Sequence, residues 1–411
     1  MPEVLLLDRE YAEKLDAADP LAGYRDRFLL EDPALIYLNG NSLGALPRAT
    51  LARMETVFRQ EWGAALARSW DHWVDLPARA GDVVGELIGA AAGQVIVTDN
   101  TTVNLYKLAS AALEERPGRQ VIITDHDNFP SDRYVLAGLA AQRGAELRML
   151  DTDINEGLHP DLVRAAVDED TALVSLSHVA YRSGALADMA GITAIVHQAG
   201  ALMLWDLCHS VGAVPVDLDG CDADLAVGCT YKYLNAGPGA PAFAYVCARL
   251  REVLRQPIWG WFSQRDMFAM GPRYDPAPGM AKFMTGTPSI PGTAAVEEGA
   301  RLLLEAGIGP MRAKSVRLTA YLIELADAWL VPLGAAIATP REPSRRGGHV
   351  TFRHPRAERI VARLAEAGVI TDYRTPDRFR LGLSPLTTRF TDVWDAADAA
   401  RALLSGGANH G

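Results

Sequence analysis

Continuous apolar runs that alternate with helical patterns constrain the fold of this chain more than any other feature. Val-, Ile- and Leu-rich runs separated by helices are typical of strands buried on both faces, as in a parallel sheet. The sequence therefore predicts an α/β fold, with a mostly parallel seven-stranded sheet between helices. The expected strands are residues 95–98, 121–124, 147–150, 172–179, 201–207, 225–230 and 242–247, and the expected helices are residues 102–114, 131–142, 160–167 and 187–199.

Polar and aromatic side chains follow several of these strands, where such sheets bind ligands. Asp206 ends the fifth strand; its carboxylate needs a partner, either a protonated ring nitrogen or the start of the next helix. Thr101 and Thr102 open a helix, which suits a phosphate but also an ordinary helix start. Phe129 could stack on a flat ring or fill the core. The set as a whole indicates a ligand site more specifically than any member does.

Lys232 lies where the sixth strand gives way to a glycine-rich turn, within residues 229–239. The chain has five lysines against 35 arginines, so an ordinary surface cation at this position could have been arginine. Lysine can lose its proton and form a Schiff base, which arginine cannot. The hypothesis is that Lys232 holds an aldehyde cofactor, while the alternative is a plain surface charge.

Composition and charge limit the kinds of partner that the chain is expected to bind. Its 411 residues carry a net charge of −11, which argues against nucleic acid or an anionic membrane as a partner. The first residues lack the pattern of a signal peptide, and no apolar run is long enough to span a bilayer. The four cysteines show no metal-binding spacing, so we expect no metal site, reduced thiols and a cytoplasmic location.

The pattern along the chain predicts three parts. Residues 1–50 form an N-terminal arm that packs with the small domain, residues 51–295 form the large domain, and residues 296–411 form a small α/β C-terminal domain. Within the arm, residues 39–44 (NGNSLG) indicate either a simple turn or a loop that approaches a ligand closely.

With these residues in view, the chain resembles the kynureninases, which are pyridoxal 5′-phosphate (PLP) enzymes of fold type I. The resemblance runs nearly end to end, and several of its motifs are specific to that family rather than to the fold. The motifs are residues 39–44 (NGNSLG), 68–70 (RSW), 101–105 (TTVNL), 128–132 (NFPSD), 205–210 (WDLCHS), 228–235 (GCTYKYLN), 260–262 (GWF), 379–380 (FR) and 384–386 (SPL).

The resemblance implies a PLP Schiff base to Lys232, with Asp206 on the pyridine nitrogen, and the hydrolysis of L-kynurenine to anthranilate and L-alanine in tryptophan catabolism. It also implies a homodimer whose active site lies at the subunit interface, because Trp261 and Thr287 would reach the phosphate of the neighbouring subunit. Lys232 and Tyr231 would move protons. The remaining cofactor-binding residues would be Thr101, Thr102, Phe129, Pro130, Ser131, Asp132, Ser177 and His209, and the substrate-binding residues Arg380, Ser42, Trp70 and Gly286.

Two positions depart from the family pattern and bear on substrate preference. Ser263 and Gln264 stand where the family usually has Gly-His, and Thr387 replaces a tyrosine common in bacterial members. We expect both positions to lie near the active site. The residues around Arg68 and Thr287 resemble members that favour L-kynurenine over its 3-hydroxy form.

Other functions agree less well with the sequence. A hydrolase for a ring-modified kynurenine is the strongest alternative, because of Gln264 and Thr387. A cysteine desulfurase would need a reactive cysteine on a mobile loop, and no cysteine follows Cys247. A silent PLP-binding regulator would have no need to retain Lys232, Asp206 and Arg380 together.

Overall fold

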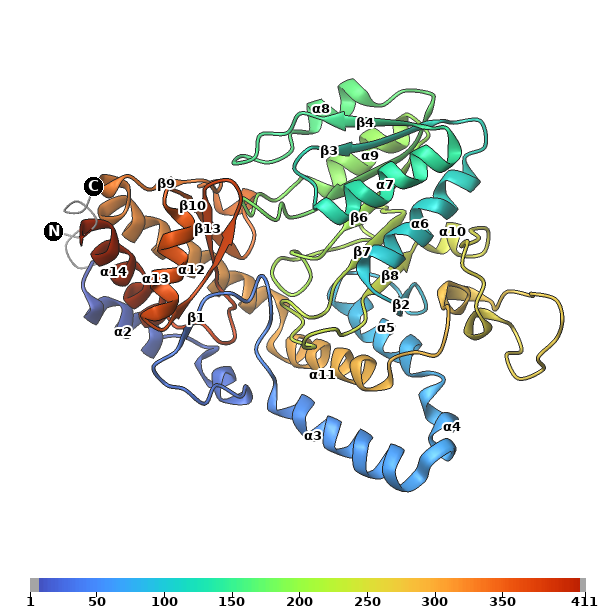
Figure 1. Cartoon of the computed structure of the whole chain (residues 1–411), viewed down its shortest axis with the longest axis horizontal. Coiled ribbons are helices and arrows are strands. Elements are labelled where there is room, and N and C mark those ends of the chain that lie inside the picture. The colour runs from blue at the N-terminus through green and yellow to red at the C-terminus, as the bar shows by residue number, and fades with distance from the viewer. Residues whose placement is uncertain (1–6, 407–411) are drawn as a thin grey trace.

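The large sheet has seven strands, as predicted, in the order β2-β8-β7-β6-β5-β3-β4 (Figure 1). The computed structural model describes residues 7–406. Strand β8 runs antiparallel to both of its neighbours, and every other neighbouring pair is parallel. The strands are β2 (Val95–Val97), β3 (Val121–Asp125), β4 (Glu146–Leu150), β5 (Thr171–Ser177), β6 (Leu202–Asp206), β7 (Leu225–Gly228) and β8 (Phe243–Val246).

Helices cover this sheet because most of its strands are apolar and buried. All residues of β3, β6 and β7 are buried, whereas the edge strand β4 is partly exposed. Helices α6 and α7 pack on one another and on the strands, and α5 packs against β2 and α11. The helices around this sheet are α5 (Leu76–Leu87), α6 (Thr101–Glu115), α7 (Pro130–Arg143), α8 (Pro160–Ala166), α9 (Met189–Gln198), α10 (Ala248–Arg251) and α11 (Ile290–Ala306).

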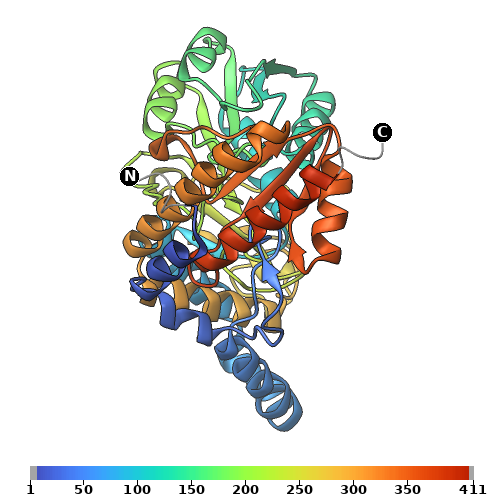
Figure 2. The ribbon, with the colours of Figure 1, turned by 90° about the vertical axis from the view of Figure 1, so that its left-hand side faces the viewer.

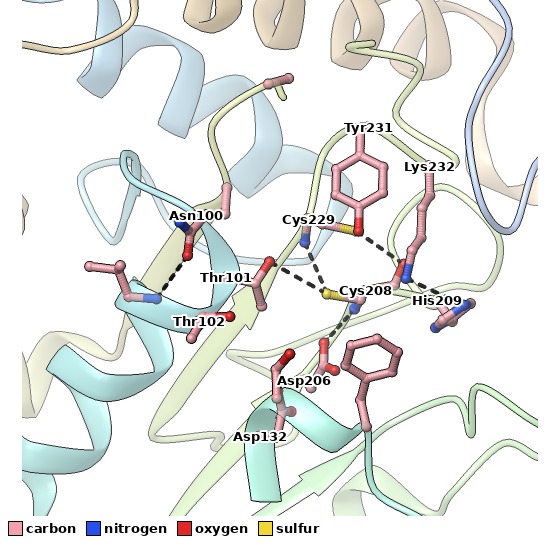
Figure 3. Close-up of a pocket in the computed structure, with 15 residues that line it drawn as sticks. Asn100, Thr101, Thr102, Asp132, Asp206, Cys208, His209, Cys229, Tyr231 and Lys232 are labelled. Atoms are coloured by element: carbon pink, nitrogen blue, oxygen red, sulfur yellow. Dashed lines mark hydrogen bonds between the residues drawn. The ribbon is translucent and has the colours of Figure 1, made fainter. Parts of the chain in front are cut away.

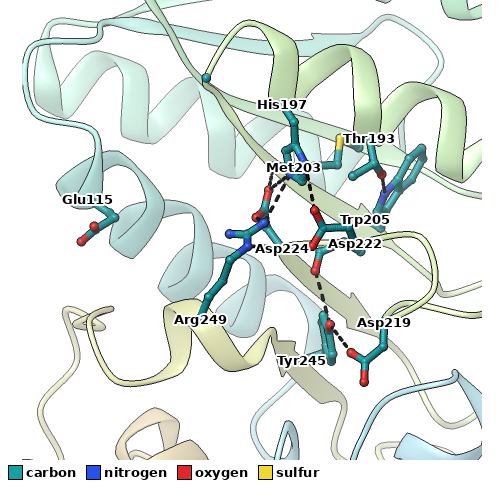
Figure 4. Close-up of polar contacts among 12 residues, drawn as sticks. Glu115, Thr193, His197, Met203, Trp205, Asp219, Asp222, Asp224, Tyr245 and Arg249 are labelled. Atoms are coloured by element: carbon teal, nitrogen blue, oxygen red, sulfur yellow. Dashed lines mark hydrogen bonds and ion pairs between the residues drawn. The ribbon is translucent and has the colours of Figure 1, made fainter.

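The amino ends of the strands carry a fully paired buried carboxylate, Asp224, just before β7 (Figure 4). It accepts hydrogen bonds from the backbone N–H of Met203 (2.7 Å) and from Nε2 of His197 (2.8 Å), and it contacts Arg249. The bond to Asp224 raises the pKa of His197. Each lone pair that burial would leave bare is thus satisfied, as expected for a structural charge.

A second, four-stranded antiparallel sheet lies beside the first, in the order β12-β13-β10-β9. The helical region before this sheet is divided into α11 and α12 at Gly307, whose φ of +77° ends α11. The elements are α12 (Ile308–Trp329), β9 (Ala336–Ile337), β10 (His349–Arg353), α13 (Ala357–Glu366), β11 (Val369–Ile370), β12 (Asp372–Arg374), β13 (Arg378–Gly382) and α14 (Phe390–Gly406).

The N-terminal segment packs on this second unit. Helix α2 (Arg9–Ala17) contacts α14 and makes an ion pair between Arg9 and Asp395 (2.8 Å), while β1 (Ile36–Tyr37) pairs in parallel with β11. A second hydrophobic cluster, separate from that of the large sheet, includes Ala12 and Leu38 from this segment. The boundaries that the sequence predicts between the arm, the large domain and the small domain, at residues 50 and 295, stay a prediction.

Residues 48–92 are mostly helical, but their middle departs from the α-helix. After α3 (Arg48–Thr56), the chain continues as a π-helix over Val57–Ala65 and then as short turns of helix, including α4 (Trp70–Trp73), before α5. Figure 2 shows α3 and its continuation projecting from the rest of the structure. This projection carries large exposed apolar side chains, among them Phe58 and Trp62.

One contact between the two units is made by a loop of the large unit, residues 181–186, which we call the seam loop. Three of its carbonyl groups accept bonds from side chains of the small unit: that of Ser183 from Thr339 (2.6 Å), that of Arg182 from Thr351 (2.5 Å) and that of Tyr181 from Arg380. The backbone N–H of Leu186 donates to the carbonyl of Arg345 (2.9 Å). Main-chain atoms of the seam loop thus help to position the small unit, together with contacts elsewhere such as that of Arg378 with Asn155 (2.8 Å). In the part of the chain that the structure describes, no helix could cross a bilayer.

Two helical glycines differ sharply in their surroundings, which gives a test of the packing. A Cβ at Gly81 in α5 would lie 2.3 Å from the carbonyl oxygen of Val95, whereas a Cβ at Gly138 in α7 would meet nothing within 4 Å. We expect Gly81→Ala to lower the free energy of unfolding by roughly 2–3 kcal/mol. Gly138→Ala, the matched control, should raise it by about 0.5–1 kcal/mol. Urea unfolding measures both, and equal stability of the two variants would refute this account of the α5–β2 contact.

Candidate active site

A cavity of about 410 Å³ lies at the carboxyl ends of the central strands, where the fold predicts a ligand (Figure 3). Its volume is in the usual range for small-molecule sites. Much of the site predicted from sequence lines it. The lining residues are Asn100, Thr101, Thr102, Val103, Phe129, Ser131, Asp132, Asp206, Cys208, His209, Cys229, Tyr231, Lys232, Ala240 and Ala242.

The Lys232 side chain points into this cavity rather than to solvent, and only 8% of the residue is exposed. Its Nζ lies 3.4 Å from Nε2 of His209 and 5.8 Å from the ring centres of both Phe129 and Tyr231. Burial, followed by the charge of Lys232, lowers the pKa of His209 well below its usual range. His209 is therefore neutral and can accept a hydrogen bond from the lysine.

The loop at residues 39–44 packs directly on the Lys232 turn. The backbone N–H of Gly44 donates to the carbonyl of Tyr231 (2.8 Å), and a Cβ at Gly44 would lie 2.2 Å from the carbonyl oxygen of Lys232. Glycine is needed there because any side chain would push the two loops apart. Ser42 belongs to this loop but does not line the cavity of Lys232.

Two carboxyl groups, Asp206 and Asp132, lie side by side at the floor of the cavity. Oδ1 of Asp206 accepts the backbone N–H of Cys208 (2.7 Å), which fixes its orientation. Burial, followed by the neighbouring Asp206, raises the pKa of Asp132 well above its usual range. Oδ2 of Asp132 has no hydrogen-bond partner among the described residues. Asp132 therefore differs from Asp224, whose two oxygens both have partners.

The start of α6 contributes two hydroxyl groups that are not used for capping. The N-cap of this helix is Asn100, whose side chain accepts the backbone N–H of Val103 (3.0 Å). Thr101 and Thr102 follow it and line the cavity; Thr101 Oγ1 lies 3.8 Å from Cys208 Sγ. Because Asn100 caps the helix, the two threonines are free to meet an anion at the helix N-terminus.

Phe129 lies at the mouth of the cavity and is not a core residue. It is 37% exposed, and its ring packs edge-on against Tyr181 with 5.2 Å between centres. Pro130 begins α7 directly after it. Ser177, predicted to touch the cofactor, does not line the cavity; its hydroxyl donates to Asn128 (2.8 Å), whose Oδ1 also accepts the Phe129 N–H. Ser177 thus supports the backbone of Phe129 instead.

Arg380 is 1% exposed and approaches the site from the small sheet, without lining the cavity of Lys232. Its Nε donates to Asp372 (2.7 Å), its Nη2 contacts the same carboxylate, and its Nη1 contacts the carbonyl of Tyr181. Its charge also lowers the pKa of His209, so it faces the same site. Its proposed contact with a substrate carboxylate stays a prediction.

A second cavity of about 500 Å³ adjoins the first and shares Asn100, Tyr231 and Ala240 with it. Gly286 and Thr287 line this second cavity and are exposed. Trp70 and Trp261 line neither cavity: Trp70 packs on Trp73 and Phe262, and Trp261 packs edge-on against Phe262. Trp261 remains 41% exposed. Within one chain, these two tryptophans are thus not brought to Lys232.

The two positions that depart from the family pattern do not line the Lys232 cavity, and their expected place near the active site stays a prediction. Gln264 closes a surface loop: its side chain accepts the backbone N–H of Asp275 (2.7 Å) and donates to the carbonyl of Arg273 (3.3 Å). Thr387 follows β13, and its carbonyl contacts Arg25. In a single chain, the Gln264 side chain and the Thr387 backbone thus make local contacts.

Sequence reasoning missed several residues of the site. Cys208 and Cys229 line the cavity, and Cys208 Sγ accepts the backbone N–H of Cys229 (3.2 Å). The sequence did contain a signal for these two cysteines, because each of them follows one of two neighbouring strands, β6 and β7. Asp372, the partner of Arg380, gave no such signal, since only the pairing of β12 with β13 places it opposite Arg380.

Solved structures that resemble this chain share its fold. They include the apo structure of a cysteine desulfurase from Thermococcus onnurineus NA1 (TM-score 0.79, 19% identity, covering 96% of this chain and 98% of that one). Another is the C-DES mutant K223A with glycine covalently linked to the PLP cofactor (TM-score 0.78, 20% identity, covering 92% and 98%). The chain therefore has the fold that these structures share, that of fold type I.

Two family models match the sequence, the kynureninase C-terminal domain over residues 311–400 and the DegT/DnrJ/EryC1/StrS aminotransferase family over residues 82–220. A kynureninase from Pseudomonas fluorescens is 46% identical over 398 residues, which cover 95% of this chain and 94% of the relative. One from Burkholderia pseudomallei (strain 1106a) is 46% identical over 405 residues, covering 96% and 95%. The chain belongs to the kynureninase family.

Asp125, behind Phe129 at the end of β3, makes stability depend on pH. Burial, followed by the charge of Asp127, raises the pKa of Asp125 to about 7, compared with a usual value of 3.8. As pH rises from about 4 to 7, the unfolded chain loses this proton and the folded chain keeps it, so folding becomes less favourable.

Asp125→Asn should remove this contribution and still accept the backbone N–H of Asp127. Relative to wild type, the variant should gain about 3 kcal/mol in the free energy of unfolding between pH 4.5 and pH 8. Urea unfolding at the two pH values measures this gain, and parallel pH profiles of variant and wild type would contradict the assignment.

Proposed function

We propose that this chain hydrolyses L-kynurenine to anthranilate and L-alanine, with PLP held at Lys232. The observation that carries the proposal is the buried Lys232 beside a neutral His209, an exposed aromatic ring and a carboxylate, in a chain of the kynureninase family. The unpartnered Oδ2 of Asp132 and the free hydroxyls at the start of α6 support a polar, phosphorylated ligand in this cavity.

Each residue has a role that its surroundings permit. Lys232 would hold the aldehyde and later move a proton at the substrate Cα, while Asp206, fixed by the Cys208 N–H, would pair with the ring nitrogen. When bound, PLP supplies an electron sink for a carbanion. Burial, followed by Cys229, raises the pKa of Tyr231, so its hydroxyl stays protonated and suits proton donation. Phe129 would cover the ring, and Thr101 and Thr102 would meet the phosphate.

The second cavity is our candidate for the aryl ring of the substrate. It adjoins the first at Tyr231 and is bordered by Gly286 and Thr287. A homodimer would complete it, with Trp261 and Thr287 supplied to the partner's cofactor and with Ser42 and Trp70 near the ring. The exposed apolar side chains of this region, Trp62, Trp259, Trp261, Phe268 and Met270, support a buried subunit interface.

We also propose a preference for L-kynurenine over 3-hydroxy-L-kynurenine and a cytoplasmic location. The free thiols of Cys208, Cys221, Cys229 and Cys247 support a reducing compartment. Neither Gln264 nor Thr387 lines the Lys232 cavity, so neither favours a ring-modified substrate over L-kynurenine.

The function is tested by turnover and by covalent attachment of the cofactor. Wild type should release fluorescent anthranilate from L-kynurenine, more slowly from the 3-hydroxy substrate, and should gain the mass of PLP after borohydride reduction. Lys232→Ala should show neither mass gain nor turnover, because Lys232 is the one lysine that lines the cavity among the described residues 7–406. Lys14→Ala, an exposed lysine paired with Glu10, is the control. A wild type that neither binds PLP nor cleaves L-kynurenine would refute the proposal.

The carboxylate contact of Arg380 is tested by Arg380→Ala. Loss of a buried guanidinium that meets the substrate carboxylate should raise KM roughly 100-fold while kcat changes much less. Arg353→Ala removes an exposed arginine of the neighbouring strand and should leave both constants unchanged. Steady-state kinetics measure both variants, and an unchanged KM in Arg380→Ala would remove this residue from substrate binding.

A further inference from the structure

Arg380 shares its carboxylate partner with a second guanidinium, that of Arg374. Nη2 of Arg374 lies 2.8 Å from Oδ2 of Asp372. Arg380 contacts the same Oδ2 through its own Nη2 and reaches Oδ1 through Nε at 2.7 Å. Two guanidinium groups therefore meet on one oxygen of Asp372.

The pairing of the strands turns this cluster toward the active site. Asp372 on β12 lies opposite Arg380 on β13, which lies opposite Thr351 on β10. Residues two apart on a strand share a face, so Arg374 lies on the same side as Asp372. On β10, His349 shares the face of Thr351, and its ring centre lies 5.7 Å from that of His209, which lines the cavity of Lys232.

The charges of the cluster do not cancel. Arginine stays protonated in proteins, so Arg374 and Arg380 carry two positive charges against the one carboxylate of Asp372. The nearby acids Asp127 and Asp377 have other arginine partners, Arg182 for the first, and Arg353 and Arg378 for the second. A pair of Asp372 and Arg380 alone would be neutral and would attract a substrate carboxylate only weakly. With Arg374 the cluster keeps one positive charge.

We propose that Arg374 is a positioning residue of the substrate-carboxylate site. The positive charge of Arg374 offsets the negative charge of Asp372. The charge of the buried Arg380 then remains available to attract the α-carboxylate of an amino acid. Asp372 and the Tyr181 carbonyl hold the guanidinium of Arg380 in place before the ligand arrives, which lowers the cost of binding. The inference rests on the proposed function for the choice of an amino acid as ligand.

The test measures binding of L-alanine to the holoenzyme by calorimetry. The matched ligand is L-alaninamide, which has an uncharged carboxamide in place of the carboxylate. Arg374→Gln should raise the Kd of L-alanine roughly tenfold and should not raise that of L-alaninamide, which has no carboxylate for the cluster to attract. Arg374→Lys keeps the charge and should bind L-alanine nearly as wild type does. The double variant D372N/R374Q again has one positive charge and should recover most of the loss. Arg353→Gln is the control on the same sheet.

Three results would overturn the inference: an unchanged Kd of L-alanine in Arg374→Gln, equal weakening for both ligands, or a double variant no better than Arg374→Gln. Thermal unfolding of each variant checks its folding, and Arg374→Lys keeps the test decisive if Arg374→Gln is unstable. Turnover separates this inference from the proposed function. Wild type that binds L-alanine with this charge dependence but leaves L-kynurenine intact would refute the function alone.

Discussion

The parallel pairing of β5, β6 and β7 is the constraint on which the active site depends. Ser177, Asp206 and Val227 lie opposite one another in register, so the three strands end at one edge of the sheet. The segments that follow those ends carry Asp206, His209 and Lys232 into one cavity. Shifting any strand by one residue would turn its side chains to the other face and separate these groups.

Buried charges are treated differently in the scaffold and in the site. Asp224 in the scaffold has a backbone donor, a histidine and an arginine around it. In the site, Asp132 keeps an oxygen without a partner, and His209 and His349 are held neutral by burial. Buried polar groups without hydrogen-bond partners lower the free energy of unfolding. A ligand that binds the folded chain can raise it again.

Much of the large sheet and of the cavity could be predicted from the sequence, because both follow from local patterns. Apolar runs marked the strands, and side chains just after them, such as Phe129, Asp206 and Lys232, reached the cavity. Contacts between distant segments could not be predicted in this way. Nothing local to Asp372 shows that it meets Arg380, and the π-helix after α3 has no simple sequence signal. Nor does the sequence around Ser177 indicate that its hydroxyl donates a hydrogen bond to Asn128.

The seam loop has a consequence for how this family can vary. Three side chains of the small unit bind carbonyl oxygens at residues 181–183, and a carbonyl is present whatever side chain the residue carries. Substitutions at residues 181–183 therefore leave these three acceptors in place, whereas Gly184, with a φ of +74°, has no room for a side chain. The length of the loop must also be kept, because one inserted residue would displace the carbonyl that accepts from Arg380 without any change at Arg380 itself.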